Sequence, residues 1–331
     1  MAYRLRYQPD MPRLSRRSLL LAGIGTVCAG TPLWTHADPI PANKGVAAPS
    51  PSSPPAFDFS LNTGTISGFN LGIEEEINVA AKAGYHYIEP WIRSLEAFVE
   101  KGGNLADLKK RLDDHGIGVV NAIAFFPWVV DDATRRAAGI EQMKREMAIL
   151  QALDCPRIAA TGSGTGENRM NDFSVMGERY RAILEIGESM GVIPQLEIWG
   201  AAKTLNTLSD AMAVAAAAGH AKSSLLLDAY HLYRGGSSFE GLRLVDGKAL
   251  GVFHINDYPA DPPREKARDR DRVYPGDGVC PLPLILDILK SNGFAGVLSF
   301  EVFNPNYWAT GDPVGVARTG LEKMKALCAG K

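Results

Sequence analysis

Four apolar segments in the second half of the 331-residue sequence end on residues that can bind a metal ion. These residues are Glu197, Asp228, His254 and Glu301. Three converging carboxylates would repel one another, and isolated buried charges cost several kcal/mol. One divalent metal ion removes that conflict, with His254 as its neutral nitrogen ligand. Such an oxygen-rich set favours Mn²⁺, with Mg²⁺, Co²⁺ or Zn²⁺ as alternatives, over a structural zinc site.

This set of residues predicts an enzyme that transfers a proton at a carbon next to a carbonyl group. When adjacent hydroxyl and carbonyl oxygens chelate the ion, it polarises the C=O bond and acidifies the neighbouring C–H bond. A carboxylate on one face then takes the proton and leaves a metal-stabilised cis-enediolate. Return of the proton to the neighbouring carbon is isomerisation, and return to the opposite face of the same carbon is epimerisation. Two carboxylates around one ion fit either outcome.

The elements that must position these residues alternate between short apolar strands and helices. We expect strands at 59–63, 85–91, 117–125, 157–161, 192–199, 224–228, 250–256 and 297–303. We expect helices at 73–83, 105–115, 133–153, 173–190, 208–218, 239–245, 282–292 and 314–328. Near-continuous apolar strands are typical of a parallel sheet that is buried on both faces. Eight strand–helix pairs in about 275 residues predict a single-domain α/β fold, the (β/α)8 TIM barrel, with its active site at the strand C-termini. A doubly wound sheet is disfavoured because no G-x-G-x-x-G follows the first strand.

Five segments of the second half resemble a known family. They are Gln195–Glu197, Leu227–His231, Phe253–Asp257, Arg272–Gly278 and Ser299–Glu301. In order and spacing they resemble the xylose isomerase-like superfamily, the sugar phosphate isomerases and epimerases. The segment Pro275-Gly276-Asp277-Gly278 is similar to that of inosose and keto-inositol members. The first half resembles the family only in its alternation of strands and helices.

The resemblance implies roles for the residues around the metal ion. It places the ion on the same four strand-end residues. It implies that Glu197 and Glu301 flank the substrate carbon and exchange its proton, and that His231 and Arg272 contact substrate oxygens. His231 is also a candidate auxiliary base, because it follows Asp228 by three residues.

Three further residues are candidate substrate contacts. Glu89, near the end of the second strand, is placed to bind a sugar hydroxyl. Trp128 is one of several aromatic residues at strand ends, where aromatic rings often cover the apolar face of a sugar. Lys203 stands where ketohexose epimerases of the superfamily tend to carry a substrate-binding acid. A lysine there argues against a simple ketohexose substrate.

The sequence therefore predicts an enzyme, a metal-dependent isomerase or epimerase of an unphosphorylated sugar, keto-sugar or cyclitol. The main alternative is a metal-dependent lyase that cleaves 3-keto-glycosides by elimination, with His231 as the base. A DNA repair endonuclease of this fold needs a three-metal site rich in His, whereas His86, His115 and His220 do not end predicted strands. A non-catalytic sugar-binding protein is disfavoured by the complete set of four metal-binding residues.

Residues 1–37 resemble a twin-arginine (Tat) export signal. Arg16 and Arg17 precede the apolar run Leu19–Ala29, which is too short for a membrane span of roughly 20 residues. An uncleaved membrane anchor is the alternative. Thr35-His36-Ala37 fits a cleavage site. Residues 38–56 are rich in Pro, Ala and Ser and are expected to be a disordered linker before the barrel at 57–331.

The signal predicts a periplasmic protein whose partners are the Tat export machinery and a small carbohydrate. The chain has a net charge of −2, and without residues 1–37 it has 30 basic and 36 acidic residues, which disfavours nucleic acid as a partner. Export in the folded state would let Mn²⁺ bind in the cytoplasm before tighter-binding metals are met outside. Phosphorylated sugars are scarce outside the cytoplasm. The sequence leaves a homo-oligomer open.

Overall fold

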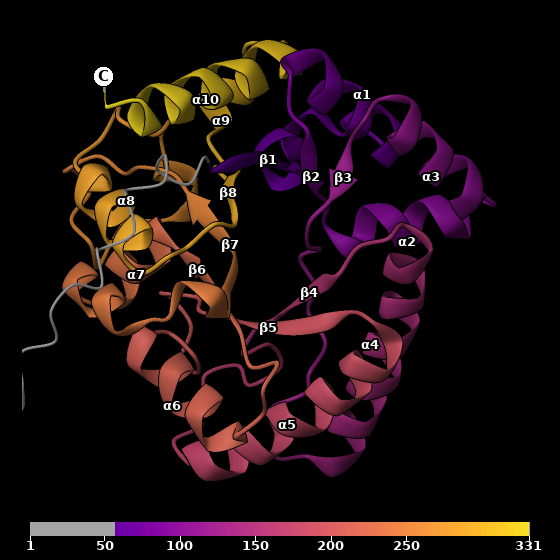
Figure 1. Cartoon of the computed structure of the whole chain (residues 1–331), viewed down its shortest axis with the longest axis vertical. Coiled ribbons are helices and arrows are strands. Elements are labelled where there is room, and N and C mark those ends of the chain that lie inside the picture. The colour runs from indigo at the N-terminus through magenta and orange to yellow at the C-terminus, as the bar shows by residue number, and fades with distance from the viewer. Residues whose placement is uncertain (1–56, 331) are drawn as a thin grey trace, which may run out of the picture. The chain divides into compact units, whose positions relative to one another are not determined.

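The computed structural model describes residues 57–330, so the predicted signal (1–37) and linker (38–56) lie outside the described residues. Eight parallel strands form one sheet in the order β3-β2-β1-β8-β7-β6-β5-β4. They are β1 Asp58–Asn62, β2 Tyr87–Glu89, β3 Gly118–Val119, β4 Arg157–Ala160, β5 Ile193–Glu197, β6 Leu225–Asp228, β7 Leu250–Ile255 and β8 Val297–Phe300. The sheet curls into a ring with the helices outside it (Figure 1). The predicted (β/α)8 barrel is confirmed.

The helices outside the ring are mostly those expected from the sequence. The α-helices are α1 Ile73–Ala83, α2 Ile92–Glu100, α3 Leu105–Asp114, α4 Ala133–Ala152, α5 Phe173–Met190, α6 Leu208–Ala218, α7 Ala229–Gly235, α8 Leu282–Ser291, α9 Pro305–Trp308 and α10 Pro313–Cys328. Short 3-10 helices are η1 Thr63–Phe69, η2 Phe239–Leu244, η3 Gly247–Ala249 and η4 Asp269–Asp271. The bounds of α1, α5 and α6 match the prediction residue for residue. The sequence did not predict η1, α2, α7 or α9.

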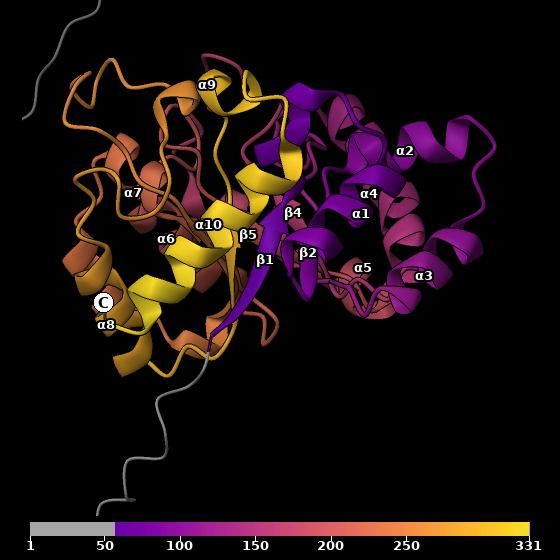
Figure 2. The same cartoon turned by 90° about the horizontal axis from the view of Figure 1, so that it is seen from above.

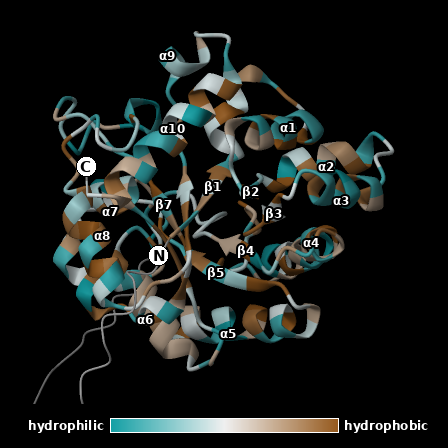
Figure 3. Ribbon diagram, turned by 45° about the horizontal axis from the view of Figure 1, so that its top comes forward, coloured by the Kyte–Doolittle hydropathy of each residue, from teal (hydrophilic) through white to brown (hydrophobic). Residues whose placement is uncertain are grey.

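The first and last parts of the barrel pack together. Helix α10 contacts α1 and β1, so the C-terminal helix covers the start of the barrel (Figure 2). The strands are mostly hydrophobic, whereas the helices alternate between hydrophobic and hydrophilic residues (Figure 3). None of the helices within residues 57–330 is long and apolar enough to cross a bilayer.

The barrel closes between β3 and β4 with very little pairing. The predicted strand 117–125 is reduced to two residues in β3, and β3 and β4 are the two ends of the sheet order. The backbone N–H of Ala159 donates to the carbonyl of Ala122 at 2.9 Å. The Arg157 side chain donates to the carbonyl of Val120 at 3.3 Å. These two hydrogen bonds connect the ends of the sheet.

Strand register explains how the polar residues reach one place. In a strand, residues two apart point to the same face. Val252, Leu226 and Val297 belong to one buried apolar cluster with Val120 and Ile123. Two residues farther along β6, β7 and β8, the inward positions change from apolar to polar. Asp228 pairs with His254, and His254 pairs with Ser299.

Candidate active site and metal centre

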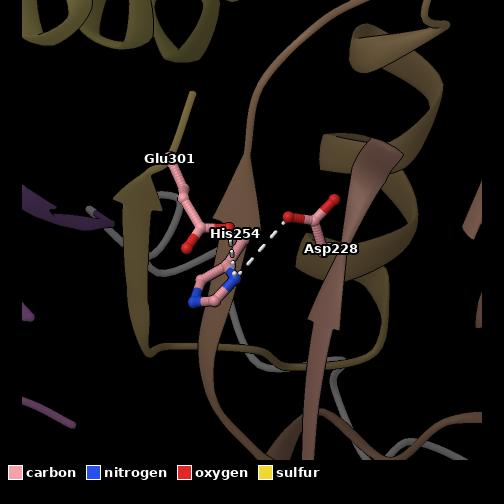
Figure 4. Close-up of side chains that lie close together, drawn as sticks. All are labelled: Asp228, His254 and Glu301. Carbon is pink, nitrogen blue, oxygen red and sulfur yellow. Dashed lines mark ion pairs between the residues drawn. The ribbon is translucent and has the colours of Figure 1, made fainter. Parts of the chain in front are cut away.

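Three predicted metal ligands lie together at the C-terminal ends of β6, β7 and β8. The Nδ1 atom of His254 is 3.6 Å from Asp228 Oδ2 and 3.5 Å from Glu301 Oε2 (Figure 4). All three side chains are buried, and one possible ligand atom from each lies within 4.8 Å of the others. Glu197, at the end of β5, lies farther out, with its Oε1 atom 4.0 Å from the same nitrogen. Three predicted carboxylate ligands thus face one nitrogen of the fourth predicted ligand, His254.

The free atoms at this centre fit a divalent cation. His254 is completely buried, and its Nδ1 atom has no hydrogen-bond partner anywhere in residues 57–330. Its other nitrogen, Nε2, lies 3.0 Å from the Glu89 carboxylate. A carboxylate that holds one ring nitrogen in this way is typical of a metal-binding histidine, whose other nitrogen points at the ion. Glu197 Oε2 is likewise buried without a partner in this part of the chain.

Glu89 does not have the role expected from the sequence. It is completely buried, and its carboxylate accepts hydrogen bonds from Asn62 Nδ2 at 3.0 Å, Asn121 Nδ2 at 2.8 Å and Ser299 Oγ at 2.6 Å. With His254 as a fourth partner, it has no oxygen left for a sugar hydroxyl. The expectation of a substrate contact is therefore corrected, because Glu89 lies below the cavity and fixes the His254 ring. This network joins β1, β2, β7 and β8.

Burial and neighbouring charges give the acids at the centre different pKa values. Burial raises the pKa of Glu197 to about 8, and this effect outweighs the nearby His254. Burial likewise raises the pKa of Glu301. Burial alone would raise the pKa of Asp228, but the Arg272 guanidinium and His231 outweigh it and hold that pKa below its usual value. Asp228 is therefore suited to stay ionised, whereas Glu197 can carry a proton near neutral pH.

Arg272 reaches the centre from the loop after η4. Its Nη1 atom donates to Glu301 Oε2 at 2.9 Å and to Asp228 Oδ2 at 3.2 Å. Its Nη2 atom lies 3.0 Å from His231 Nε2. Although Arg272 follows a run of charged residues, only 1% of it is exposed. The structure thus brings Arg272 and His231 to the same wall of the site, as the sequence predicted for two substrate contacts.

Aromatic rings contact the Arg272 side chain, and hydrogen bonds to Asp257 hold the loop that follows it. Its guanidinium carbon lies 4.5 Å from the Tyr230 ring centroid and 5.2 Å from that of Phe303. Asp257, after β7, accepts hydrogen bonds from the backbone N–H groups of Gly276 at 3.0 Å and Gly278 at 3.1 Å. A Cβ atom at Gly278 would lie 2.2 Å from a carbonyl oxygen, so only glycine fits. The predicted motifs contained Asp257 but gave it no role.

A cavity of about 350 Å³ opens above the candidate metal centre. Its lining includes Glu197, Glu301, His231, Arg272, Asp269, Trp91, Trp199, Phe303 and Arg93. Trp91, Trp199 and Phe303 give one part of the wall an aromatic surface. Phe125 packs between the two tryptophans, with its ring centroid 5.3 Å from that of Trp91 and 5.2 Å from that of Trp199. Asp269 and Arg93 were missed because they lie outside the predicted elements. Phe303 was inside a predicted strand, as its last residue, but was given no role.

Two other predicted substrate contacts lie away from this cavity. Trp128 is completely buried, donates from Nε1 to the carbonyl of Thr161 at 2.7 Å, and packs against Tyr180. It is a core residue, so its expected contact with the sugar is corrected. Lys203 is exposed and is not among the residues that line the cavity in the described part of the chain. Its expected substrate contact stays a prediction.

The barrel, the strand-end acids and the cavity agree with a known family. Residues 77–327 match the xylose isomerase-like TIM barrel family. The chain belongs to that family. Inosose isomerase of Bacillus velezensis is 31% identical over 246 residues, which cover 72% of this chain and 86% of that relative. Inosose isomerase of Halalkalibacterium halodurans is 30% identical over 254 residues, with the same coverage. These relatives confirm the predicted class of enzyme, an isomerase or epimerase.

Two further family members bear on the chemistry. The solved structure of the IOLI protein with a zinc atom bound has a TM-score of 0.76 and 25% identity to this xylose isomerase-like chain. It covers 82% of this chain and 98% of its own. The 3-dehydroshikimate dehydratase of Pseudomonas aeruginosa is 25% identical over 263 residues, which cover 76% of this chain and 38% of that relative.

Proposed function

We propose that this chain is a divalent-metal-dependent isomerase or epimerase of an unphosphorylated sugar, keto-sugar or cyclitol. One observation carries the proposal. His254 is fixed through Nε2 by Glu89, and its free Nδ1 atom faces three carboxylates beneath an aromatic cavity. The similarity to two inosose isomerases supports a polyhydroxylated ring with a keto group as the substrate.

Asp228, His254, Glu301 and Glu197 would hold the metal ion. When bound, a divalent ion polarises a substrate carbonyl and makes the adjacent C–H bond more acidic. We propose Mn²⁺ because three of the four ligands are carboxylates. The zinc atom bound in the similar solved structure supports a divalent ion and keeps Zn²⁺ as the alternative.

Glu197 and Glu301 would move the proton. Both line the cavity, and their carboxylates lie 4.0 Å and 3.5 Å from the same His254 nitrogen. A substrate carbon between them would have a carboxyl group on each face, so one accepts a proton while the other donates one. His231 and Arg272 would bind substrate oxygens, and Trp91 and Trp199 would cover the apolar face of the ring.

A second candidate function is a lyase that cleaves 3-keto-glycosides by elimination. Burial and the Arg272 charge lower the pKa of His231 to about 4, so its imidazole is neutral at pH 7. A neutral imidazole at the cavity wall is free of a proton and can accept one, although a pKa of about 4 makes it a weaker base than an ordinary histidine. The similarity to a dehydratase, an enzyme named for elimination of water, supports this candidate.

One experiment separates the two functions. Protein loaded with Mn²⁺ is incubated in D₂O with inososes, keto-sugars and 3-keto-glycosides, and the products are followed by NMR and mass spectrometry. An isomerase or epimerase returns a sugar of the same composition with deuterium at one carbon. A lyase releases the leaving group and an unsaturated keto-sugar. If no substrate incorporates deuterium or loses its leaving group, both functions are refuted.

We further propose export by the Tat machinery to the periplasm. The proposal is supported by the order of Arg16, Arg17 and the apolar run Leu19–Ala29. Replacing both arginines with lysine should keep the protein in the cytoplasmic fraction, whereas the unaltered protein should be found in the periplasmic fraction. Equal distribution of the two proteins would refute twin-arginine export.

A further inference from the structure

A second cavity lies beside the candidate active site. It has a volume of about 480 Å³ and is bounded by η1, the start of α1 and the helix α2. Three residues, Ser67, Trp91 and Arg93, line both this cavity and the one above the metal centre. A molecule bound over the metal centre would therefore meet the second cavity at these side chains.

Trp91 and Arg93 form a fixed border between the two cavities. The Trp91 Nε1 atom donates to Asn62 Oδ1 at 2.9 Å, which fixes the indole ring. The Arg93 guanidinium carbon lies 4.1 Å from the Trp91 ring centroid. The indole also packs against two aromatic rings, Phe125 at 5.3 Å and Phe303, which lines the first cavity, at 5.8 Å between ring centroids.

Glu76 supplies an unused polar group in the second cavity. It belongs to α1, lines the cavity and is 4% exposed. Its Oε1 atom accepts a hydrogen bond from Ser94 Oγ at 3.2 Å. Its Oε2 atom is buried and has no partner among residues 57–330. A buried polar atom without a partner costs on the order of 1–3 kcal/mol, which a ligand hydroxyl would relieve.

The protonation of Glu76 also suits a hydroxyl ligand. Burial raises the pKa of Glu76 to about 7, against the opposing effect of Ser94. A carboxyl group that is partly protonated near neutral pH can both donate to and accept from a sugar hydroxyl. The rest of the lining combines polar residues, among them Asn70, Glu74 and Lys101, with the apolar side chains of Leu71, Ile73, Ala97 and Phe98.

We propose that the second cavity is a subsite for a second sugar ring, joined by a glycosidic bond to the ring that reacts over the metal centre. The substrate is then a glycosylated keto-sugar or cyclitol rather than a single free ring. Volumes of about 350 and 480 Å³ each lie in the range of cavities that hold small molecules. This inference rests on the proposed function and names its substrate class.

Two variants test the subsite by filling it. Ala97, on α2, lines the second cavity but not the first, so Ala97→Phe should occupy the place of the second ring. Gly72 lines the same cavity, and a Cβ atom added there meets no other atom within 4 Å, so Gly72→Leu is an independent filling variant. Val99→Phe is the matched control, because Val99 is an exposed residue of α2 outside both linings.

The probes are methyl 3-keto-α-glucoside, which has one ring, and 3-keto-sucrose, which has two. The unaltered protein should have kcat/KM for solvent deuterium exchange or elimination about tenfold higher with the two-ring probe, a gain that corresponds to about 1.4 kcal/mol. Ala97→Phe and Gly72→Leu should remove this gain and leave the one-ring value within about twofold. Val99→Phe should change neither value.

Calorimetric Kd values separate failure of the subsite from failure of the proposed function. If neither probe reacts but 3-keto-sucrose binds about tenfold more tightly and loses that advantage in both filling variants, the subsite stands and the chemistry is wrong. If both probes react or bind equally well, or if the filling variants affect both equally, the subsite is refuted. Absence of binding and reaction with either probe refutes both.

Discussion

The Nε2 atom of His254 lies 3.0 Å from the carboxylate of Glu89, a residue 165 positions earlier in the chain. The same carboxylate accepts hydrogen bonds from Asn62, Asn121 and Ser299. The orientation of the central imidazole is therefore set from the opposite side of the barrel. This explains why Nδ1 alone is free to face the acids on β5, β6 and β8.

Glu89→Gln should weaken metal binding without abolishing the fold. An amide cannot offer the His254 Nε2–H a negative partner, and loss of such an outer partner typically lowers metal affinity by about 10- to 100-fold. Competition with a chromophoric chelator measures the Mn²⁺ affinity. Glu74→Gln, an exposed acid on α1, is the control. Equal affinity in Glu89→Gln and the unaltered protein would show that Glu89 serves only the core.

Glu301→Gln should stop turnover far more than it weakens substrate binding. The amide can still offer an oxygen to the metal ion, but it cannot exchange a proton. We expect kcat to fall by about 10²- to 10⁴-fold, the usual contribution of a general acid or base. Steady-state kinetics and calorimetric Kd values check this, with the exposed Glu322→Gln on α10 as control. A change in KM alone would assign Glu301 a binding role.

Removal of the metal ion should lower the thermal stability of the protein as well as its activity. A ligand that binds only the folded state stabilises it by RT ln(1 + [L]/Kd), about 2.7 kcal/mol at a concentration 100 times Kd. Protein treated with a chelator should show a lower Tm, and Mn²⁺ should restore both Tm and activity. Asp228→Asn should not respond to Mn²⁺. The same Tm with and without Mn²⁺ in the unaltered protein would refute the metal site.

Glu146 should make stability depend on pH independently of the active site. It is completely buried on α4, its Oε1 accepts from Gln142 at 2.7 Å, and its Oε2 has no partner in the described chain. Burial raises the pKa of Glu146 to about 7. The folded-state pKa is above the unfolded value, so the neutral acid is favoured on folding. The protonated acid therefore contributes to stability at low pH. This contribution starts to fall as pH rises above the pKa of the unfolded state and is lost above pH 7.

Glu146→Gln should therefore increase stability at pH 8 by on the order of 2 kcal/mol and have little effect at pH 4.5. Urea denaturation at the two pH values measures the difference. Glu141→Gln, on the exposed side of the same helix, is the control and should change stability little at either pH. An equal effect of Glu146→Gln at both pH values would mean that packing rather than ionisation determines its contribution.

Strand periodicity was enough to predict the fold and the convergence of the acids. Asp228, His254 and Glu301 come at or after the ends of apolar strands, and parallel strands bring their C-terminal ends together. The sequence also placed Arg272 near them through the segment that ends in Gly278. The fold and the converging acids depend on neighbours along one strand or on the shared direction of all strands, whereas Arg272 was placed through the resemblance of its segment to a known family.

The misassigned residues Glu89 and Trp128 depend on contacts between distant strands. Glu89 was at a strand end like the true cavity residues, but hydrogen bonds from three other strands or loops enclose it. Trp128 was expected at the rim, yet the chain after β3 folds inward and its indole reaches the carbonyl of Thr161. Lys203 lies in the loop after β5, whose direction strand periodicity does not define. Side-chain direction in such loops is decided by tertiary contacts.

The weak pairing of β3 with β4 gives the barrel wall a seam across from β7 and β8. The Ala159–Ala122 backbone bond and side-chain contacts such as that of Arg157 with Val120 link β4 to the segment that follows β3, whereas β6, β7 and β8 are paired along their length. Segments with few backbone hydrogen bonds open at lower free energy than the rest of a domain. Amide protons around β3 should therefore exchange with solvent sooner than those of β7. Because Asn121 lies between Val120 and Ala122 and donates to Glu89, which holds His254, opening of this seam would reach the imidazole at the centre of the site.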